Sequence, residues 1–160
     1  MSVVRRALIP PDVQFRSRQR KPRATVSYAL TTTVRGAFAD TLAATRTSLA
    51  DQGFGVLTEI DMQATLKAKL DVDIPSQVIL GACRPPLAYA SLQVEPSIGL
   101  LLPCNVVVRS LDEDTTIVET IDPSIMVSLT GNEALSSVAD EAGRRLTAAL
   151  AALTNANADN

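Results

Sequence analysis

The chain has 160 residues, 46% of them hydrophobic and 20% charged, with a formal net charge of −2, a composition typical of one globular domain. It contains no histidine, which excludes Ser-His-Asp and Cys-His catalysis, histidine-containing zinc sites and histidine-ligated haem. Two cysteines are too few for a disulfide scaffold, and no apolar run approaches the roughly 20 residues of a membrane helix, so we expect a cytoplasmic protein with reduced thiols.

Charge is distributed unevenly along the chain. Residues 1–23 carry seven basic residues and one acidic residue, 7 − 1 = +6, whereas the remainder carries 8 − 16 = −8. We interpret residues 1–23 as a disordered basic arm, residues 24–154 as a single domain and residues 155–160 as a frayed tail. The arm predicts weak contact with nucleic acid or another anionic surface, and the alternative is a solvated tail without a partner.

Hydrophobic periodicity predicts four elements in the first half of the domain. They are a strand over 25–34, a helix over 35–52, a strand over 54–60 and a short helix over 62–70. Gly53 suits the left-handed position after the first helix, and Asp61 can cap the second. The alternation of Phe54, Val56 and Ile60 predicts that these side chains share one face of their strand.

The same patterns predict the elements of the second half. They are a strand over 77–83, a helix over 86–94, a strand over 100–109, a strand over 115–121, a short helical segment ending at 129 and a long last helix capped by Asn132. Pro103 cannot donate a ladder hydrogen bond, so we expect an unpaired position, an edge or a bulge beside Cys104. The order β-α-β-α-β-α-β-β-α, with a hairpin between the last two strands, predicts an α+β domain whose mixed or antiparallel sheet has helices packed on it.

The stretch that holds both cysteines is the most unusual part of the sequence, because it also contains the longest apolar run. Prolines after Cys83 and before Cys104 leave backbone groups unpaired, and unpaired groups can hold a small ligand. Tyr89, Glu95 and Asn105 are expected to edge the same cleft. One hypothesis is therefore a pocket for a small molecule or effector.

Thiol chemistry is the alternative hypothesis for this stretch. Arg84, a further candidate ligand-binding residue, would favour the reactive thiolate of Cys83. Adjacent strands can bring Cys83 and Cys104 within reach of a disulfide, worth about 3 kcal/mol in the chain-entropy model, or of a soft metal ion such as Cu(I). A third interpretation treats both cysteines as small buried hydrophobes. No catalytic residue is assigned, because Glu119, the best-placed acid on a strand, has no partner for general acid–base work.

Several short segments form a recognisable set. They are Gly53-Phe54-Gly55-Val56, Ile79-Leu80-Gly81-Ala82-Cys83 with Pro85, Ala88-Tyr89-Ala90, Glu95-Pro96-Ser97-Ile98-Gly99-Leu100, Leu102-Pro103-Cys104-Asn105-Val106, Ile121-Asp122-Pro123 and Gly131-Asn132. With them, the chain from about residue 53 to residue 153 resembles a bacterial family, domain of unknown function 302. The resemblance implies a compact α+β domain that forms a homodimer, with no established activity, and it therefore assigns no catalytic residue and no cofactor.

Overall fold

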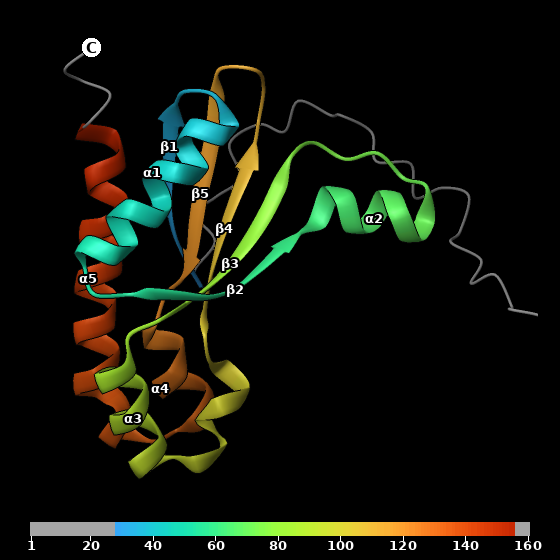
Figure 1. Cartoon of the computed structure of the whole chain (residues 1–160). Coiled ribbons are helices and arrows are strands. Elements are labelled where there is room, and N and C mark those ends of the chain that lie inside the picture. The colour runs from blue at the N-terminus through green and yellow to red at the C-terminus, as the bar shows by residue number, and fades with distance from the viewer. Residues whose placement is uncertain (1–27, 156–160) are drawn as a thin grey trace, which may run out of the picture.

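The computed structural model describes residues 28–155 (Figure 1). The predicted basic arm over residues 1–23 lies outside the described residues, and so does the predicted tail beyond Asn155. In chain order the elements are β1 (Ala29–Arg35), α1 (Phe38–Asp51), β2 (Gly55–Asp61), α2 (Met62–Leu70), β3 (Gln77–Cys83), α3 (Pro85–Val94), the 3-10 helix η1 (Pro96–Leu101), β4 (Cys104–Ser110), β5 (Thr115–Ile121), α4 (Ser124–Thr130), the 3-10 helix η2 (Glu133–Leu135) and α5 (Ser136–Asn155). None of the helices in this part of the chain has the length and apolar character that crossing a bilayer requires.

The five strands form one sheet with the order β1-β5-β4-β3-β2. Every neighbouring pair is antiparallel, including β1 and β5, which are far apart in the sequence. The predicted α+β class is confirmed, and of the two sheet types that the sequence left open the antiparallel one is present. The strands β4 and β5 form the predicted hairpin.

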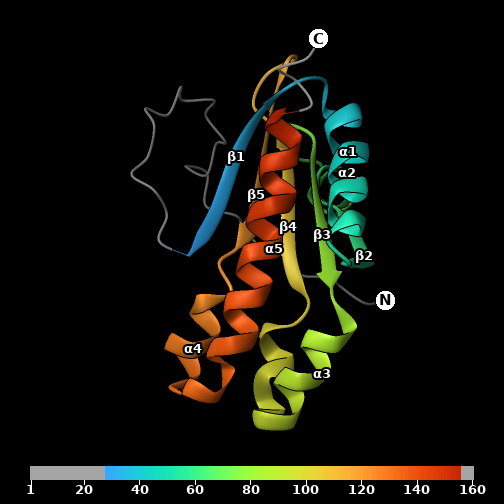
Figure 2. The ribbon, with the colours of Figure 1, turned by 90° about the vertical axis from the view of Figure 1, so that its left-hand side faces the viewer.

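The helices α1 and α5 lie side by side on one face of this sheet, which we call the inner face (Figure 2). Alternate residues of the central strands point toward these helices and form the main core. The buried strand residues of this core are Val34, Val78, Leu80, Ala82, Cys104, Val106, Val108 and Val118. Leucines spaced three or four residues apart on α5 pack against them, as the periodicity of the last helix predicted.

A second, smaller core lies at one end of the sheet, where α3, α4 and η1 gather (Figure 1). Its buried residues are Ile98, Met126 and Leu135. The side-chain oxygen of Asn132 accepts a hydrogen bond from the Ala134 backbone N–H at 3.1 Å. The predicted cap at Asn132 is therefore present, one 3-10 turn before α5 begins.

The strand β2 contains a bulge that the sequence pattern did not predict. Its register against β3 shifts just after Val56, so that Val56 faces inward whereas Ile60 pairs with Ile79 on the opposite, outer face. The prediction that Phe54, Val56 and Ile60 share one face is therefore wrong for Ile60. One extra residue in a strand reverses the alternation of every side chain beyond it.

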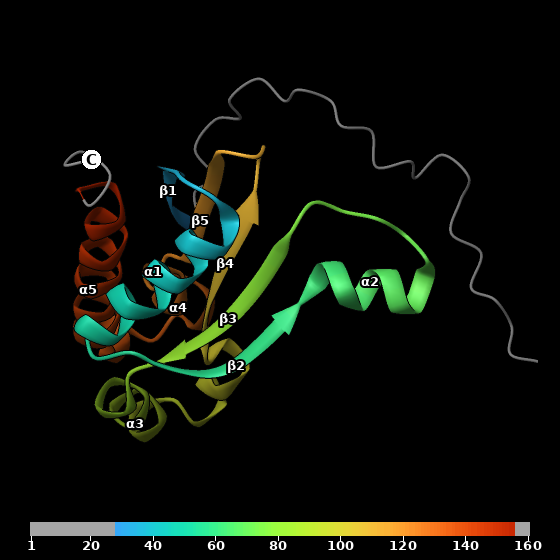
Figure 3. The ribbon, with the colours of Figure 1, turned by 45° about the horizontal axis from the view of Figure 1, so that its top comes forward.

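Beyond the bulge, β2 and α2 project from the body on the side away from α5 (Figure 3). We call residues 57–76 the β2–α2 extension. No residue of α2 is buried, and its contacts are with β2 and β3. The helix is held by local bonds: the Asp61 carboxylate accepts from the Ala64 N–H at 2.8 Å, and Gln63 donates to the Ile74 carbonyl at 2.9 Å.

The predicted strand over 100–109 is wrong in its first half. Residues Pro96–Leu101 form η1, and β4 begins only at Cys104. Proline readily opens a helical turn, because its φ is fixed near the helical value. Pro103 precedes β4, so it removes no hydrogen bond from the ladder, and β4 pairs regularly with β3 from Cys104 to Arg109. The expected bulge is therefore not found in β4, but its pairing with β5 begins only at Val106, so Cys104 and Asn105 are paired with β3 alone and the expected unpaired position is present on the β5 side.

Candidate functional site

The two cysteines lie near each other in the chain fold but face opposite sides of the sheet. Cys104 pairs with Ala82 and is buried in the main core, with 7% of its surface exposed. Cys83 follows Ala82 in β3 and is half-buried on the other face, because successive strand residues alternate. Both thiols are free, and residues 28–155 contain no group of three or more acidic, cysteine or histidine side chains that can hold a metal ion. This geometry does not support the redox or soft-metal alternative.

The electrostatic environment of the thiols is also that of unreactive cysteines. Burial raises the pKa of the Cys104 thiol to about 11, and the charge of nearby Cys83 adds to this effect. Burial also raises the pKa of the Cys83 thiol.

The side chain of Arg84 lies across Gly53, with its Nε 3.2 Å from the position that a Cβ on Gly53 would take. Gly53 itself has a φ of +80°, which confirms its predicted left-handed role after α1.

We expect an aromatic disulfide reagent to modify Cys104 only after the protein unfolds. A pKa of about 11 against a usual 9.0 leaves about 100-fold less thiolate at mildly alkaline pH, and burial adds a steric barrier. Cys83 should react in the native state, but more slowly than a free cysteine. Reaction rates of the Cys83→Ala and Cys104→Ala variants separate the two thiols. A Cys83 that reacts faster than free cysteine would contradict this prediction and revive the activated-thiolate hypothesis.

The other predicted site residues lie on two surfaces, the outer face of the sheet and the helical end. Tyr89 is 67% exposed on α3. Glu95 ends α3, and its carboxylate accepts a hydrogen bond from the Asn132 side-chain amide at 3.4 Å. Asn105 is exposed on the outer face of β4, where it pairs with Gly81. The structure thus brings Asn105 and Cys83 to one face, whereas Tyr89 and Glu95 belong to the helical end.

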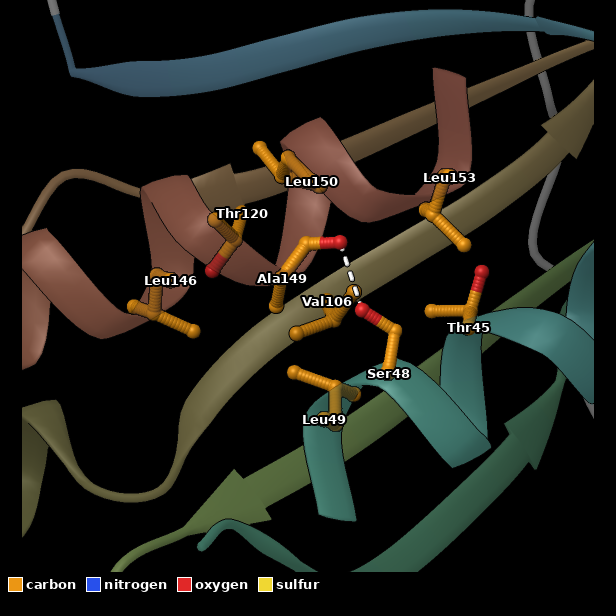
Figure 4. Close-up of a pocket in the computed structure, with 9 residues that line it drawn as sticks. All are labelled: Thr45, Ser48, Leu49, Val106, Thr120, Leu146, Ala149, Leu150 and Leu153. Atoms are coloured by element: carbon orange, nitrogen blue, oxygen red, sulfur yellow. Dashed lines mark hydrogen bonds between the residues drawn. The ribbon is translucent and has the colours of Figure 1, made fainter. Parts of the chain in front are cut away.

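A small internal cavity lies between α1, α5 and the sheet (Figure 4). It is lined by Thr45, Ser48, Leu49, Val106, Thr120, Leu146, Ala149, Leu150 and Leu153. Its volume of about 10 Å³ admits at most one water molecule. The Ser48 hydroxyl donates to the Ala149 carbonyl across the two helices, so the polar groups here serve helix packing. None of the six predicted site residues lines this cavity or the surface groove described below.

The outer face of the sheet is a surface that none of the sequence motifs indicated. One row across this face joins Ile60, Ile79 and Val107, which are neighbours in the paired strands, and continues to Glu119. These side chains are half-buried or exposed, with Ile60 46% exposed. The signal in the sequence is the unbroken apolar run of β3 and of β4, because strands covered on one face only usually alternate apolar with polar residues. The described helices cover the inner face alone, which leaves this outer row as the candidate interaction surface.

Comparison with known proteins identifies the family to which this chain belongs. The family model described as "Domain of unknown function DUF302" matches residues 30–153. The crystal structure of an uncharacterized conserved protein DUF302 from Bacillus stearothermophilus is similar to this chain, with 29% sequence identity and a TM-score of 0.72. The similarity covers 78% of this chain and 97% of that one. A search of curated proteins finds no match. With nearly all of the described domain inside the family match, the chain belongs to the DUF302 family of domains of unknown function.

Proposed function

We propose that this protein is a non-catalytic interaction module that works as a homodimer, with the outer face of the sheet as its interface. The observation that carries the proposal is the apolar row of Ile60, Ile79 and Val107, which no helix of residues 28–155 covers. Contiguous apolar surface of this kind marks interaction sites in soluble proteins. A second copy is the occupant that fits the surface best, for three reasons.

The first reason is charge. Arg109 and Glu119 lie on this face and pair with each other at 3.0 Å, with 34% and 27% of their side chains exposed. The centre of the face therefore carries balanced charge, and two copies can meet there without like charges facing each other. In a two-fold dimer the same patch is used by both subunits, so self-compatibility of this kind is required.

The second reason is size. Five seven-residue strands span a face of about 24 by 24 Å, on the order of 570 Å², from the usual rise per residue and strand spacing. A stable dimer typically buries about 800 Å² on each partner. The sheet face alone is smaller than that, so α2 of the β2–α2 extension would have to contribute to the interface as well.

The third reason is the extension itself. A helix of nine residues without a buried side chain is marginal in water, and so is a two-stranded ribbon. The extension also exposes Leu57 at 64% and Leu70 at 48%. Packing of the extension against a second copy would supply the apolar contacts that it does not find within its own subunit.

Replacing Ile60 by lysine is expected to dissociate the dimer. A lysine in the apolar row would place two charges in the interface, so we expect the dimer dissociation constant to rise at least about tenfold. Light scattering with size-exclusion chromatography on the full chain measures this at several concentrations. The matched control is Leu100→Lys, because Leu100 is 88% exposed on η1, away from the sheet face. A wild-type chain that is monomeric at all concentrations, or a dimer lost in the control alone, would overturn the proposal.

Three further predictions from the sequence concern the location of the protein, a small-molecule ligand and the basic arm. A cytoplasmic location agrees with the two free thiols, since reduced cysteines persist in the cytosol. Binding of a small molecule at the predicted residues would need a cleft that gathers Tyr89, Glu95 and Asn105, and these occupy separate surfaces. Contact of residues 1–23 with nucleic acid concerns residues outside the described part of the chain.

A further inference from the structure

A surface groove lies where the described chain begins. It is formed by β1, α5 and the junction between β5 and α4, and its volume is about 260 Å³. Figure 2 shows the start of β1 beside α4 and α5. The backbone N–H of Asp122 donates to the Tyr28 carbonyl at 2.8 Å, so the chain before Tyr28 leaves the sheet next to Asp122, which itself lines the groove.

The floor of the groove is small and apolar. Leu30 of β1 and Ala139 and Gly143 of α5 line it. A Cβ on Gly143 would meet nothing closer than Pro123 Cδ at 3.9 Å, so the missing side chain leaves open space above the helix backbone. This floor can accept a small apolar side chain or a stretch of extended backbone.

The rim of the groove carries negative charge. Asp140 is exposed and makes no ion pair with any residue between 28 and 155. One Asp122 oxygen accepts from the Ser124 N–H at 2.9 Å, an exposed bond that leaves the carboxylate charge uncompensated. The one cation on the rim, Arg144, pairs with Glu141 at 2.5 Å. The groove is therefore suited to a basic peptide segment.

The sequence supplies such a segment directly before Tyr28. Residues 20–27 contain Arg20, Lys21 and Arg23, followed by the apolar Val26. Eight extended residues span at most about 28 Å, which is enough to enter a groove that begins beside Tyr28. Residues 1–23 carry a net charge of +6 against −8 for the rest of the chain, so the two parts are complementary.

We propose that residues 20–27 bind in this groove of their own chain. Their basic side chains lie against Asp122 and Asp140, and Val26 covers the floor. Attraction between exposed charges is weak, but the covalent connection provides an effective concentration in the millimolar range. Salt screens the interaction, since the Debye length falls from about 30 Å at 0.01 M to about 3 Å at 1 M. Docking would then withdraw Arg20, Lys21 and Arg23 from any contact of the arm with an external polyanion.

Limited trypsin digestion of the full chain tests this proposal. Bound segments resist the protease, so we expect slow cleavage after Arg20 at low salt. Asp140→Lys should accelerate this cleavage about three- to tenfold, and high salt should remove the difference. The matched control is Glu113→Lys, an exposed acid in the β4–β5 turn at the opposite end of β1. Both positions are exposed, so neither variant removes core packing.

A charge exchange makes the test specific. Adding Arg23→Asp to Asp140→Lys should restore slow cleavage after Arg20, because the charges are swapped and attract again. Equal cleavage rates of the wild type and Asp140→Lys at low salt would overturn the proposal. Equal acceleration by Glu113→Lys would overturn it as well, because the effect would then reflect net charge alone. These outcomes do not depend on the dimer, whose interface variants lie on the other face of the sheet.

Discussion

Replacing Leu146 by alanine is expected to lower the free energy of unfolding by about 2–5 kcal/mol, the usual cost of removing a fully buried leucine. Leu146 lies on α5 with no exposed surface, inside the main core. It also lines the small cavity between α1 and the sheet (Figure 4). Removing its side chain would enlarge an existing void, and the Ser48–Ala149 hydrogen bond fixes α1 relative to α5, which limits how far the helices can move to fill it.

Urea denaturation followed by circular dichroism measures this loss. The neighbouring Thr147 is exposed on α5, so Thr147→Ala should change the free energy of unfolding by less than about 0.5 kcal/mol. A similar slope of free energy against denaturant in all variants would show that the denatured state is unchanged. A Leu146→Ala variant within about 1 kcal/mol of the wild type would mean that α5 rearranges to fill the space.

The sequence predicted the elements whose periodicity is long and regular. On α5, apolar residues from Val138 to Leu153 recur at steps of three or four, and β3 and β5 have clear strand patterns. The local preference of these segments and their tertiary packing therefore agree. The 3-10 helix η1 was missed because Ile98, Leu100 and Leu101 are as apolar as strand residues. Pro96 favours a helical turn at this point because it occupies the first position of η1. In this conformation Ile98 is buried in the second core.

The candidate site was less predictable than the fold. Adjacent strands predict that Cys83 and Cys104 lie close together, and β3 and β4 are indeed adjacent. The face on which each side chain lies depends on the register, and the register that pairs Cys104 with Ala82 turns Cys83 the other way. Register is set by contacts between distant segments, so no local pattern around either cysteine contains it.

The bulge in β2 could not be predicted for the same reason, because it depends on how β2 pairs with β3. Leu57 is an apolar residue in a strand pattern, and nothing in its neighbours marks it as the extra residue that reverses the alternation. The consequence is functional in our proposal, because the bulge moves Ile60 from the inner face to the outer row with Ile79. Because the outer row depends on this bulge, it can be recognised only once the pairing of β2 with β3 is known.

Replacing Gly81 by alanine is expected to cost about 1–3 kcal/mol of unfolding free energy, the range found for overpacking in a well-packed site. Gly81 is buried in β3, opposite Thr58 on one side and Asn105 on the other. An added Cβ would overlap Thr58 Oγ1 and lie 2.8 Å from Pro103 Cγ. The threonine side chain can rotate away, but the proline ring is rigid, so relief is incomplete.

A double-mutant cycle separates the two contacts. In the Thr58→Ala background, Gly81→Ala should lower the free energy of unfolding by less than in the wild type. The difference is the part of the cost that comes from contact with Thr58. The matched control is Gly99→Ala, since a Cβ there would meet nothing within 4 Å and should be tolerated within about 0.5 kcal/mol. If both glycine variants lose the same stability, crowding at Gly81 is not the cause, because a Cβ at Gly99 meets nothing within 4 Å. Crowding at Gly81 would mean that Thr58 and Pro103 fill the outer face beside Cys83 and Asn105, where the ligand cleft was predicted.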